Sequence, residues 1–175
     1  DLNRYAQLRR TAVKAQGAKG TADLVTLLLK KRLFSSPAAF ASTLELHRRT
    51  LAAAGPARST EVDTLFDRLE EDFDDEDAAT EAEEAALAAA AVATGAADAE
   101  QLELLDRMTV WANANRGRPD AKTERLLQWI EDTCCPTKRG GKRTWNDERI
   151  IVFTEYRTTQ RYLQQLLEAR GLGGD

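Results

Sequence analysis

The scarcity of β-branched residues constrains the fold of this chain more than any other feature of its sequence. The 175 residues include 29 alanines and 22 leucines, but only nine valines and isoleucines together. A β-sandwich or β-barrel needs many β-branched side chains to cover its pleated faces. We therefore predict a mainly α protein, whose core depends on leucine and on eleven aromatic residues.

Charge is distributed unevenly along the chain, although the net charge is only −4. Residues 1–60 carry eleven basic and three acidic residues, whereas residues 61–86 carry thirteen acidic residues and one basic residue. A basic surface attracts a polyanion and an acidic surface repels one. The amino-terminal third is thus the better candidate for a nucleic-acid surface. The alternative is that both charge runs are solvated helix faces.

The cysteine pattern and the chain ends indicate the cellular setting. Cys134 and Cys135 are adjacent and form neither a metal-binding spacing nor a disulfide framework. A reduced, cytoplasmic location is therefore expected. No apolar run approaches the roughly 20 residues of a membrane span, and the amino terminus does not resemble a signal peptide. The missing initiator methionine and the glycine-rich end suggest a fragment of a longer protein.

Three helices are expected in residues 1–60, which we treat as one basic helical region. Glycines in residues 17–20 are expected to end the first helix, since glycine weakens a helix interior. Thr21 is then expected to cap the second helix. Ser36 and Pro37 form a strong start signal for the third, because they place an N-cap before a proline at the first helical position.

The next segments differ sharply in composition. Residues 61–97 are acidic and then almost purely alanine, and we interpret them as a low-complexity insert, part helical and part mobile. Residues 98–135 regain leucine at helical spacing. A capping box at Asp98 is expected to open one helix there, and Pro119-Asp120 another. Residues 136–148 are expected to form a basic, glycine-containing loop.

The strand-like segment is the apolar run Ile150-Ile151-Val152-Phe153. A short β-branched run bounded by charged residues is typical of a strand buried on both faces of a parallel sheet. An amphipathic helix over residues 155–170 follows directly. Residues 149–175 are therefore predicted to be the first strand–helix unit of a truncated α/β lobe. Because partner strands are missing, we expect the strand at 149–153 to self-associate or to be poorly ordered.

Two glycine-lysine segments resemble phosphate loops without matching one. A phosphate loop follows a strand and places lysine next to serine or threonine, but a glycine separates Lys19 from Thr21 and no strand precedes them. The segment 140–144 fails similarly. His47, the only histidine, lies on the apolar face of a predicted helix and is better explained by packing than by catalysis. We therefore predict no catalytic residue, metal ligand or cofactor-binding residue in this chain.

Two blocks of the sequence resemble a known family. The first, within residues 21–60, contains Lys30-Lys31-Arg32-Leu33-Phe34-Ser35-Ser36-Pro37. The second, within residues 118–172, contains Asp120-Ala121-Lys122 and Val152-Phe153-Thr154-Glu155-Tyr156-Arg157. They resemble the interlobe helices, and the entry into the second RecA-like lobe, of bacterial SWI/SNF-type ATPases in helicase superfamily two. The strand ending in V-F-T-E-Y-R-x-T resembles motif IV of that family.

The resemblance implies an ATP-dependent DNA translocase or helicase-like ATPase. In that family ATP and Mg²⁺ bind between two RecA-like lobes, and the partner is double-stranded nucleic acid, more often DNA than RNA. The phosphate loop and DExx box would precede this chain, and the arginine fingers would follow it. This chain alone is thus expected to link the remaining lobes and to contact nucleic acid without hydrolysing ATP.

Candidate nucleic-acid contacts lie in both blocks. Strand carboxyl ends and helix amino termini are places where α/β proteins bind anions. The candidate phosphate contacts are Thr154, Tyr156, Arg157, Thr158, Lys30, Lys31 and Arg32. The alternative is that Thr154 and Glu155 only cap the helix and that the basic side chains are solvated. For the whole chain, the alternative is a non-enzymatic helical module that binds DNA or a protein partner through residues 1–60.

Overall fold

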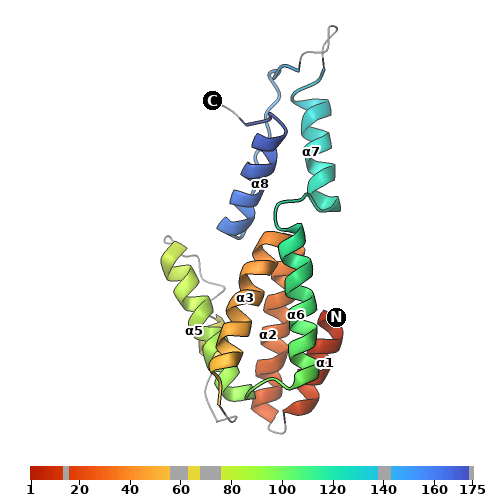
Figure 1. The fold of residues 1–175 in the computed structure, drawn as a ribbon. Coiled ribbons are helices and arrows are strands. Elements are labelled where there is room, and N and C mark those ends of the chain that lie inside the picture. Colours follow the sequence, from red (N-terminus) through yellow and green to blue (C-terminus); the bar gives the residue numbers. More distant parts are fainter. Residues whose placement is uncertain (14–15, 56–62, 68–75, 138–142, 174–175) are drawn as a thin grey trace.

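The computed structural model describes residues 1–13, 16–55, 63–67, 76–137 and 143–173. Within these ranges the protein is mainly helical, as the composition predicts, and Figure 1 shows a bundle with a further helix pair at one end. The helices are α1 (Leu2–Ala12), α2 (Gln16–Ser35), α3 (Pro37–Ala53), α4 (Asp63–Asp67), α5 (Glu76–Thr94), α6 (Ala99–Asn115), α7 (Ala121–Thr133) and α8 (Arg157–Ala169). None of the helices in the described ranges is long and apolar enough to cross a bilayer.

Helices α1, α2, α3, α5 and α6 pack around one hydrophobic core (Figure 1). Four of them each contribute a fully buried leucine, namely Leu29, Leu44, Leu87 and Leu105, and α1 contributes Tyr5. Burying a leucine side chain stabilises a fold by about 1.5–3 kcal/mol. Because the core takes a large side chain from each helix, it depends on all five.

Helix α5 differs from the low-complexity insert expected in residues 61–97. It packs in the bundle core through Ala86, Leu87, Ala90 and Ala91, which share one helix face. The distance between packed helices depends on the side chains at the contact, and small side chains allow a close approach. The alanine-rich sequence is thus a core helix. The acidic stretch just before it, at 68–75, lies outside the described residues.

The boundary between α1 and α2 lies earlier than the glycines predict. Helix α2 begins at Gln16, so the break predicted at residues 17–20 is wrong. Thr21, expected as the N-cap, is 2% exposed inside the helix. A glycine within a helix costs about 1 kcal/mol relative to alanine. The buried face that carries Val25 and Leu29 offsets this cost.

Side-chain caps start three of the helices. Ser36 Oγ accepts a hydrogen bond from a first-turn amide of α3 at 3.1 Å. Asp98 and Gln101 form the predicted capping box of α6. Asp120 accepts a hydrogen bond from the amide of Thr123 at 2.7 Å and so caps α7. Each such cap contributes about 1 kcal/mol to stability. The predicted helix starts at Ser36, Asp98 and Asp120 are therefore confirmed.

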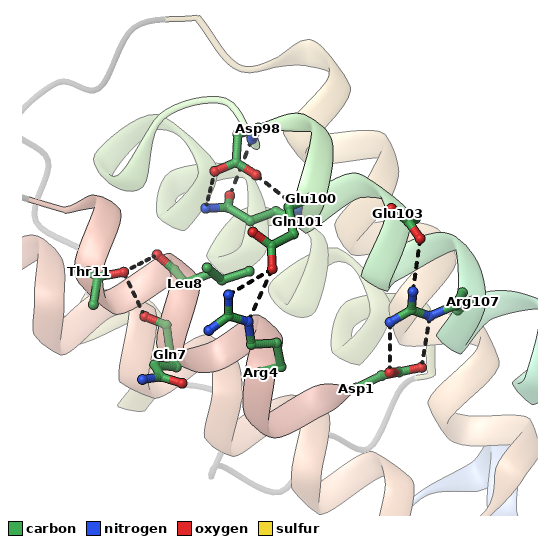
Figure 2. Close-up of polar contacts among 10 residues, drawn as sticks. All are labelled: Asp1, Arg4, Gln7, Leu8, Thr11, Asp98, Glu100, Gln101, Glu103 and Arg107. Atoms are coloured by element: carbon green, nitrogen blue, oxygen red, sulfur yellow. Dashed lines mark hydrogen bonds and ion pairs between the residues drawn. The ribbon is translucent and has the colours of Figure 1, made fainter.

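Polar contacts join α1 to α6 along their exposed edges (Figure 2). Arg4 donates two hydrogen bonds to one carboxylate oxygen of Glu100, at 2.9 and 3.1 Å. Arg107 donates to Asp1 of the chain start and to Glu103 in the preceding turn of α6. Exposed ion pairs contribute only about 0–1 kcal/mol each. These ion pairs therefore orient α1 and α6 relative to each other more than they stabilise the fold.

Arg9 anchors α1 to the connection between α5 and α6. It is 4% exposed, and its guanidinium donates to the side chains of Thr94 and Gln101 and to the carbonyls of Gly95 and Ala96. Burial lowers the pKa of Arg9 from its ordinary value. A buried cation needs such partners because its desolvation is costly. The connection is thereby fixed against α1.

A second, smaller core lies between α7, α8 and the start of α3. Leu127 and Ile130 of α7 pack there against Tyr162 and Leu166 of α8. The same cluster contains Ala38, Leu172 and the two cysteines, Cys134 and Cys135, which are buried and unbonded to each other. Gly171 ends α8, as predicted, with a φ of 68° that favours glycine.

The predicted strand at 149–153 is not formed in the part of the chain that the structure describes. Ile151 is 78% exposed and Phe153 is 90% exposed, so the expected burial on two faces is absent as well. A strand becomes stable only through pairing and packing with neighbouring strands. The described residues offer only an isolated bridge between Thr137 and Arg143. The helix predicted after the strand is present as α8.

Candidate nucleic-acid interface

The junction between α2 and α3 contacts the first turn of α8. Ser35 Oγ and Ser36 Oγ lie 2.6 and 3.0 Å from Thr159 Oγ1. Lys122, at the start of α7, donates from Nζ to the carbonyls of Phe34 and Ser35 at 2.7 and 3.0 Å. The last carbonyls of a helix lack partners within the helix, and a lysine can supply them. The end of α2 is thus held by both α7 and α8.

A hollow of about 650 Å³ opens beside this junction. Lys30 and Lys31 of α2 line it together with Thr154, which precedes α8. Phe34 and Phe153 also line it and are 75% and 90% exposed. Three of the seven predicted phosphate contacts therefore surround one hollow, although they come from segments far apart in the sequence.

Arg32, on the same helix, lies in a different environment. Its side chain is 13% exposed, and its guanidinium pairs with the carboxylate of Glu83 in α5 at 2.5 Å. The ring of Tyr156 covers the guanidinium, with 3.6 Å between Arg32 Cζ and the ring centroid. The other oxygen of Glu83 accepts a hydrogen bond from Thr43 Oγ1 at 2.6 Å. Two predicted phosphate contacts, Arg32 and Tyr156, are thus paired with each other.

Tyr156 is the N-cap residue of α8, and its side chain makes no capping hydrogen bond. Burial raises the pKa of Tyr156 to about 12, and the neighbouring guanidinium of Arg32 opposes this shift. The hydroxyl is therefore protonated at neutral pH and donates to Glu155 at 2.9 Å. Since Tyr156 is the N-cap, neither Thr154 nor Glu155 has the capping role that the simpler interpretation gave them.

The last two predicted contacts lie in the first turn of α8. Arg157 is exposed, and Thr158 is partly buried. Thr158 lines a second hollow of about 440 Å³ together with Arg32, Thr43 and Arg49. A helix amino terminus favours anions through its backbone N–H groups and its dipole. The position of Arg157 is therefore compatible with a phosphate contact.

The sequence did not reveal the residues that hold these candidates in place. Glu83 belongs to the acidic run that was assigned to the insert, and Thr43 and Thr159 are neutral residues without a motif. One signal could have identified Glu83. It lies four residues before Leu87 and seven before Ala90, and this spacing puts all three on one helix face. A carboxylate on the buried face of a helix calls for a cationic partner.

The first phosphate-loop-like segment lacks the strand-to-helix geometry of a phosphate loop. Residues 17–21 lie inside α2 and follow another helix, whereas a phosphate loop connects a strand to a helix. In the second segment, residues 140–142 lie outside the described part of the chain. Across the described ranges, no group of three or more His, Cys, Asp or Glu side chains could hold a metal ion.

The only histidine has a packing role. His47 is 2% exposed, and its Nε2 lies 2.6 Å from the hydroxyl of Tyr5. The rings of the two residues meet edge to face, with 5.9 Å between their centroids. Burial lowers the pKa of His47 to about 3, so the imidazole is neutral at physiological pH. The expectation that His47 packs in the core is confirmed.

The candidate interface is thus built from three segments of the chain, around the end of α2, the start of α7 and the start of α8. Lys30, Lys31 and Thr154 surround its hollow, and Arg32 and Tyr156 pack beside it. No family model matches the sequence, and neither a curated protein nor a solved structure shows significant similarity to it.

Proposed function

We propose that this chain is the interlobe region and motif IV segment of a SWI/SNF-type helicase-like ATPase, a DNA translocase in its complete form. In this proposal ATP and Mg²⁺ bind elsewhere in the parent protein, between its RecA-like lobes. The chain links those lobes and contributes contacts to double-stranded DNA. It is not catalytic alone.

The contact between the two blocks of family resemblance is the observation that carries the proposal. Ser35 and Thr159 are 124 positions apart, yet their hydroxyl oxygens lie 2.6 Å from each other. Arg32 and Tyr156 come from the same two blocks and also stack. The resemblance assigns these blocks to consecutive parts of one protein, the interlobe helices and the start of the second lobe. A contact between them supports that assignment.

The proposed phosphate contacts are Lys30, Lys31, Thr154, Arg157 and Thr158. Lysine, arginine and threonine are common phosphate ligands, and such contacts position a protein on DNA without reading its sequence. Arg32 and Tyr156 are assigned to a supporting role, because each covers the other. An interface of this kind suits a translocase, which must move over any sequence.

The exposed segment at 149–153 supports the same proposal. Phe153 and Ile151 are among the most exposed large apolar side chains of the described chain. Exposed apolar surface of this kind marks a site of interaction. In the complete lobe, neighbouring strands would pair with this segment and bury it, as motif IV of the family requires.

The proposal can be tested by measuring the binding of a fluorescently labelled DNA duplex by anisotropy at several salt concentrations. We expect Lys30→Gln and Arg157→Gln each to weaken binding and to lower the slope of log affinity against log salt by about one, because each removes one phosphate contact. Lys19→Gln is the matched control, since Lys19 is exposed at the opposite end of α2. Equal effects of all three substitutions would indicate diffuse charge attraction and would contradict a local interface.

A non-enzymatic helical module is the alternative function. The observation that favours it is the bundle, in which side chains of the described helices form one hydrophobic core. The reading frame around this segment separates the two functions. A Gly-Lys-Thr/Ser loop and a DExx box upstream, with a Q-x-x-G-R-x-x-R block downstream, would establish the translocase. A stop codon shortly after Asp175 would favour the module.

A further inference from the structure

Arg32 connects three separate elements of the fold. It belongs to α2, its guanidinium pairs with Glu83 of α5, and the ring of Tyr156 before α8 covers it. A guanidinium is planar, so it can bind a carboxylate along one edge while an aromatic ring stacks on its face. Lysine carries the same charge in a compact, strongly hydrated ammonium and has no flat face to stack on the ring. The geometry therefore uses properties that are specific to arginine.

The carboxylate that holds Arg32 is itself fixed. Glu83 Oε1 accepts from Thr43 Oγ1 of α3 at 2.6 Å, while Oε2 meets the guanidinium at 2.5 Å. The side chain of Glu83 is 12% exposed. With both oxygens engaged inside the bundle, the carboxylate has little freedom to turn. Arg32 is thus aimed by α3 and α5 together.

Tyr156 transmits this constraint to α8. As the N-cap, it accepts hydrogen bonds at its carbonyl from the amides of Thr159 and Gln160, at 3.0 and 3.1 Å. Any contact that fixes Tyr156 therefore fixes the first turn of α8. Thr154 lies two residues before Tyr156 and Arg157 directly after it, so both take their positions from the same residue.

We propose that Arg32 is a positioning residue that, with Glu83 and Tyr156, clamps the start of α8 onto the helical bundle. The clamp sets where Thr154 and Arg157 are presented, and Arg32 itself does not bind phosphate. What the positioned residues bind rests on the proposed function, whereas the clamp is a property of this chain. In a two-lobed translocase it would couple the interlobe helices to the nucleic-acid contacts of the second lobe.

Amide hydrogen exchange measured by NMR on the whole chain tests the clamp, because exchange rates distinguish local opening from global unfolding. We expect Arg32→Lys and Tyr156→Leu to accelerate exchange at Thr159 and Gln160 by about tenfold, as for the loss of a desolvated cation–π contact. Exchange in the buried face of α6, for example at Leu105, should not change. Tyr156→Phe keeps the aromatic ring, so exchange at Thr159 and Gln160 should stay as slow as in the wild type.

Arg49→Lys is the matched control for Arg32→Lys. Arg49 also pairs with a glutamate of α5, Glu84 at 3.1 Å, but its side chain is 68% exposed. We expect no acceleration in α8 for this variant. If Arg32→Lys prevents folding, Tyr156→Leu decides alone, because Tyr156 lies outside the bundle core.

Two results would overturn the clamp. One is unchanged exchange at Thr159 and Gln160 in Tyr156→Leu. The other is equal acceleration in α6 and α8, which would make Arg32 an ordinary stabilising residue of the bundle. The DNA-binding experiment is independent of both. A chain with the expected exchange pattern and no DNA binding would retain the clamp and lose the proposed function.

Discussion

The helical bundle and the segment before α8 both carry large apolar residues but differ in how far they bury them. In the bundle, leucines such as Leu44 and Leu105 are completely buried. In the segment before α8, Ile151 and Phe153 are 78% and 90% exposed. Both regions have sequences suited to burial. Composition thus indicates which segments could be buried. Whether a segment is buried depends on the presence of another surface that packs against it.

Truncating one apolar side chain in each region should give the largest contrast. We expect Leu44→Ala to lower the free energy of unfolding by about 3–5 kcal/mol, because it leaves a cavity in a packed core. Phe153→Ala removes a larger side chain but should change it by less than about 0.5 kcal/mol, because that side chain is already in water. Urea denaturation followed by circular dichroism measures both. Similar costs for the two variants would break the comparison.

Acid should weaken the bundle before it weakens the α7–α8 pair. The pKa of His47 is lowered by burial from 6.5 to about 3. Between these two pH values the imidazole is protonated in the unfolded chain and neutral in the folded chain. Stability is therefore complete above pH 6.5 and falls by about 1.4 kcal/mol for each pH unit as the pH drops towards 3. Urea midpoints at pH 7 and pH 5 should show this slope, and His47→Gln should lose most of it.

The corresponding group in the other region, Glu124, begins to lose its contribution only at a lower pH, because its ordinary pKa is 4.5. A hydrogen bond from Arg170 holds the pKa of Glu124, which joins α7 to α8, below its ordinary value of 4.5. Its contribution is present above pH 4.5 and is lost only as the pH falls through the lowered value. Protection factors from hydrogen exchange, which remove the intrinsic pH dependence of the rate, should therefore fall more in α3 and α6 than in α7 between pH 7 and pH 5. Equal losses of protection in all three helices would contradict this order.

The smallest effect on stability is expected from charge in the exposed segment. Ile151→Lys should change the free energy of unfolding by less than about 0.5 kcal/mol. It should nevertheless abolish the self-association predicted for the segment at 149–153, because a lysine on an edge strand prevents edge-to-edge pairing. Sedimentation equilibrium of the wild type and the variant measures this. Val110→Lys, at a residue of α6 that is 71% exposed, is the control and should leave association unchanged.

Helix starts were the most predictable part of the fold, because capping is local chemistry. The hydroxyl of Ser36 and the carboxylate of Asp98 satisfy amides within a few residues of themselves. Such contacts depend on neighbours in sequence and not on the rest of the fold. The glycine break was predicted wrongly at residues 17–20 for the complementary reason. Tertiary burial of Val25 and Leu29 outweighs a local helix penalty.

The long-range features were not predictable from local pattern. Helix α5 carries few large apolar residues, so its buried face gives a weak periodic signal, although Ala86 and Ala90 are 0% and 1% exposed. The segment at 149–153 has the opposite property, a strong local signal without a neighbour to satisfy it. A pattern of apolar residues predicts a buried face only when a covering surface exists.

The candidate contact residues of the interface were predicted from the sequence, whereas the residues that support them were not. The basic residues of α2 and the polar residues around the start of α8 were predicted separately, and the structure brings Lys30 and Thr154 to one hollow. The supporting partners Glu83 and Thr43 were not predicted, since their role depends on how α5 packs against α2 and α3. The family resemblance and the function that it implies stay predictions.

The neighbouring thiols in the smaller core give the chain a built-in probe of its own motion. Cys134 and Cys135 are 0% and 3% exposed, so an alkylating reagent can reach them only when the smaller core opens. At low reagent concentration, the modification rate then measures the equilibrium population of that open form. Any ligand that bridges the end of α2 and the start of α8 would slow the modification. Thiol chemistry could thus report occupancy of the interface without an added label.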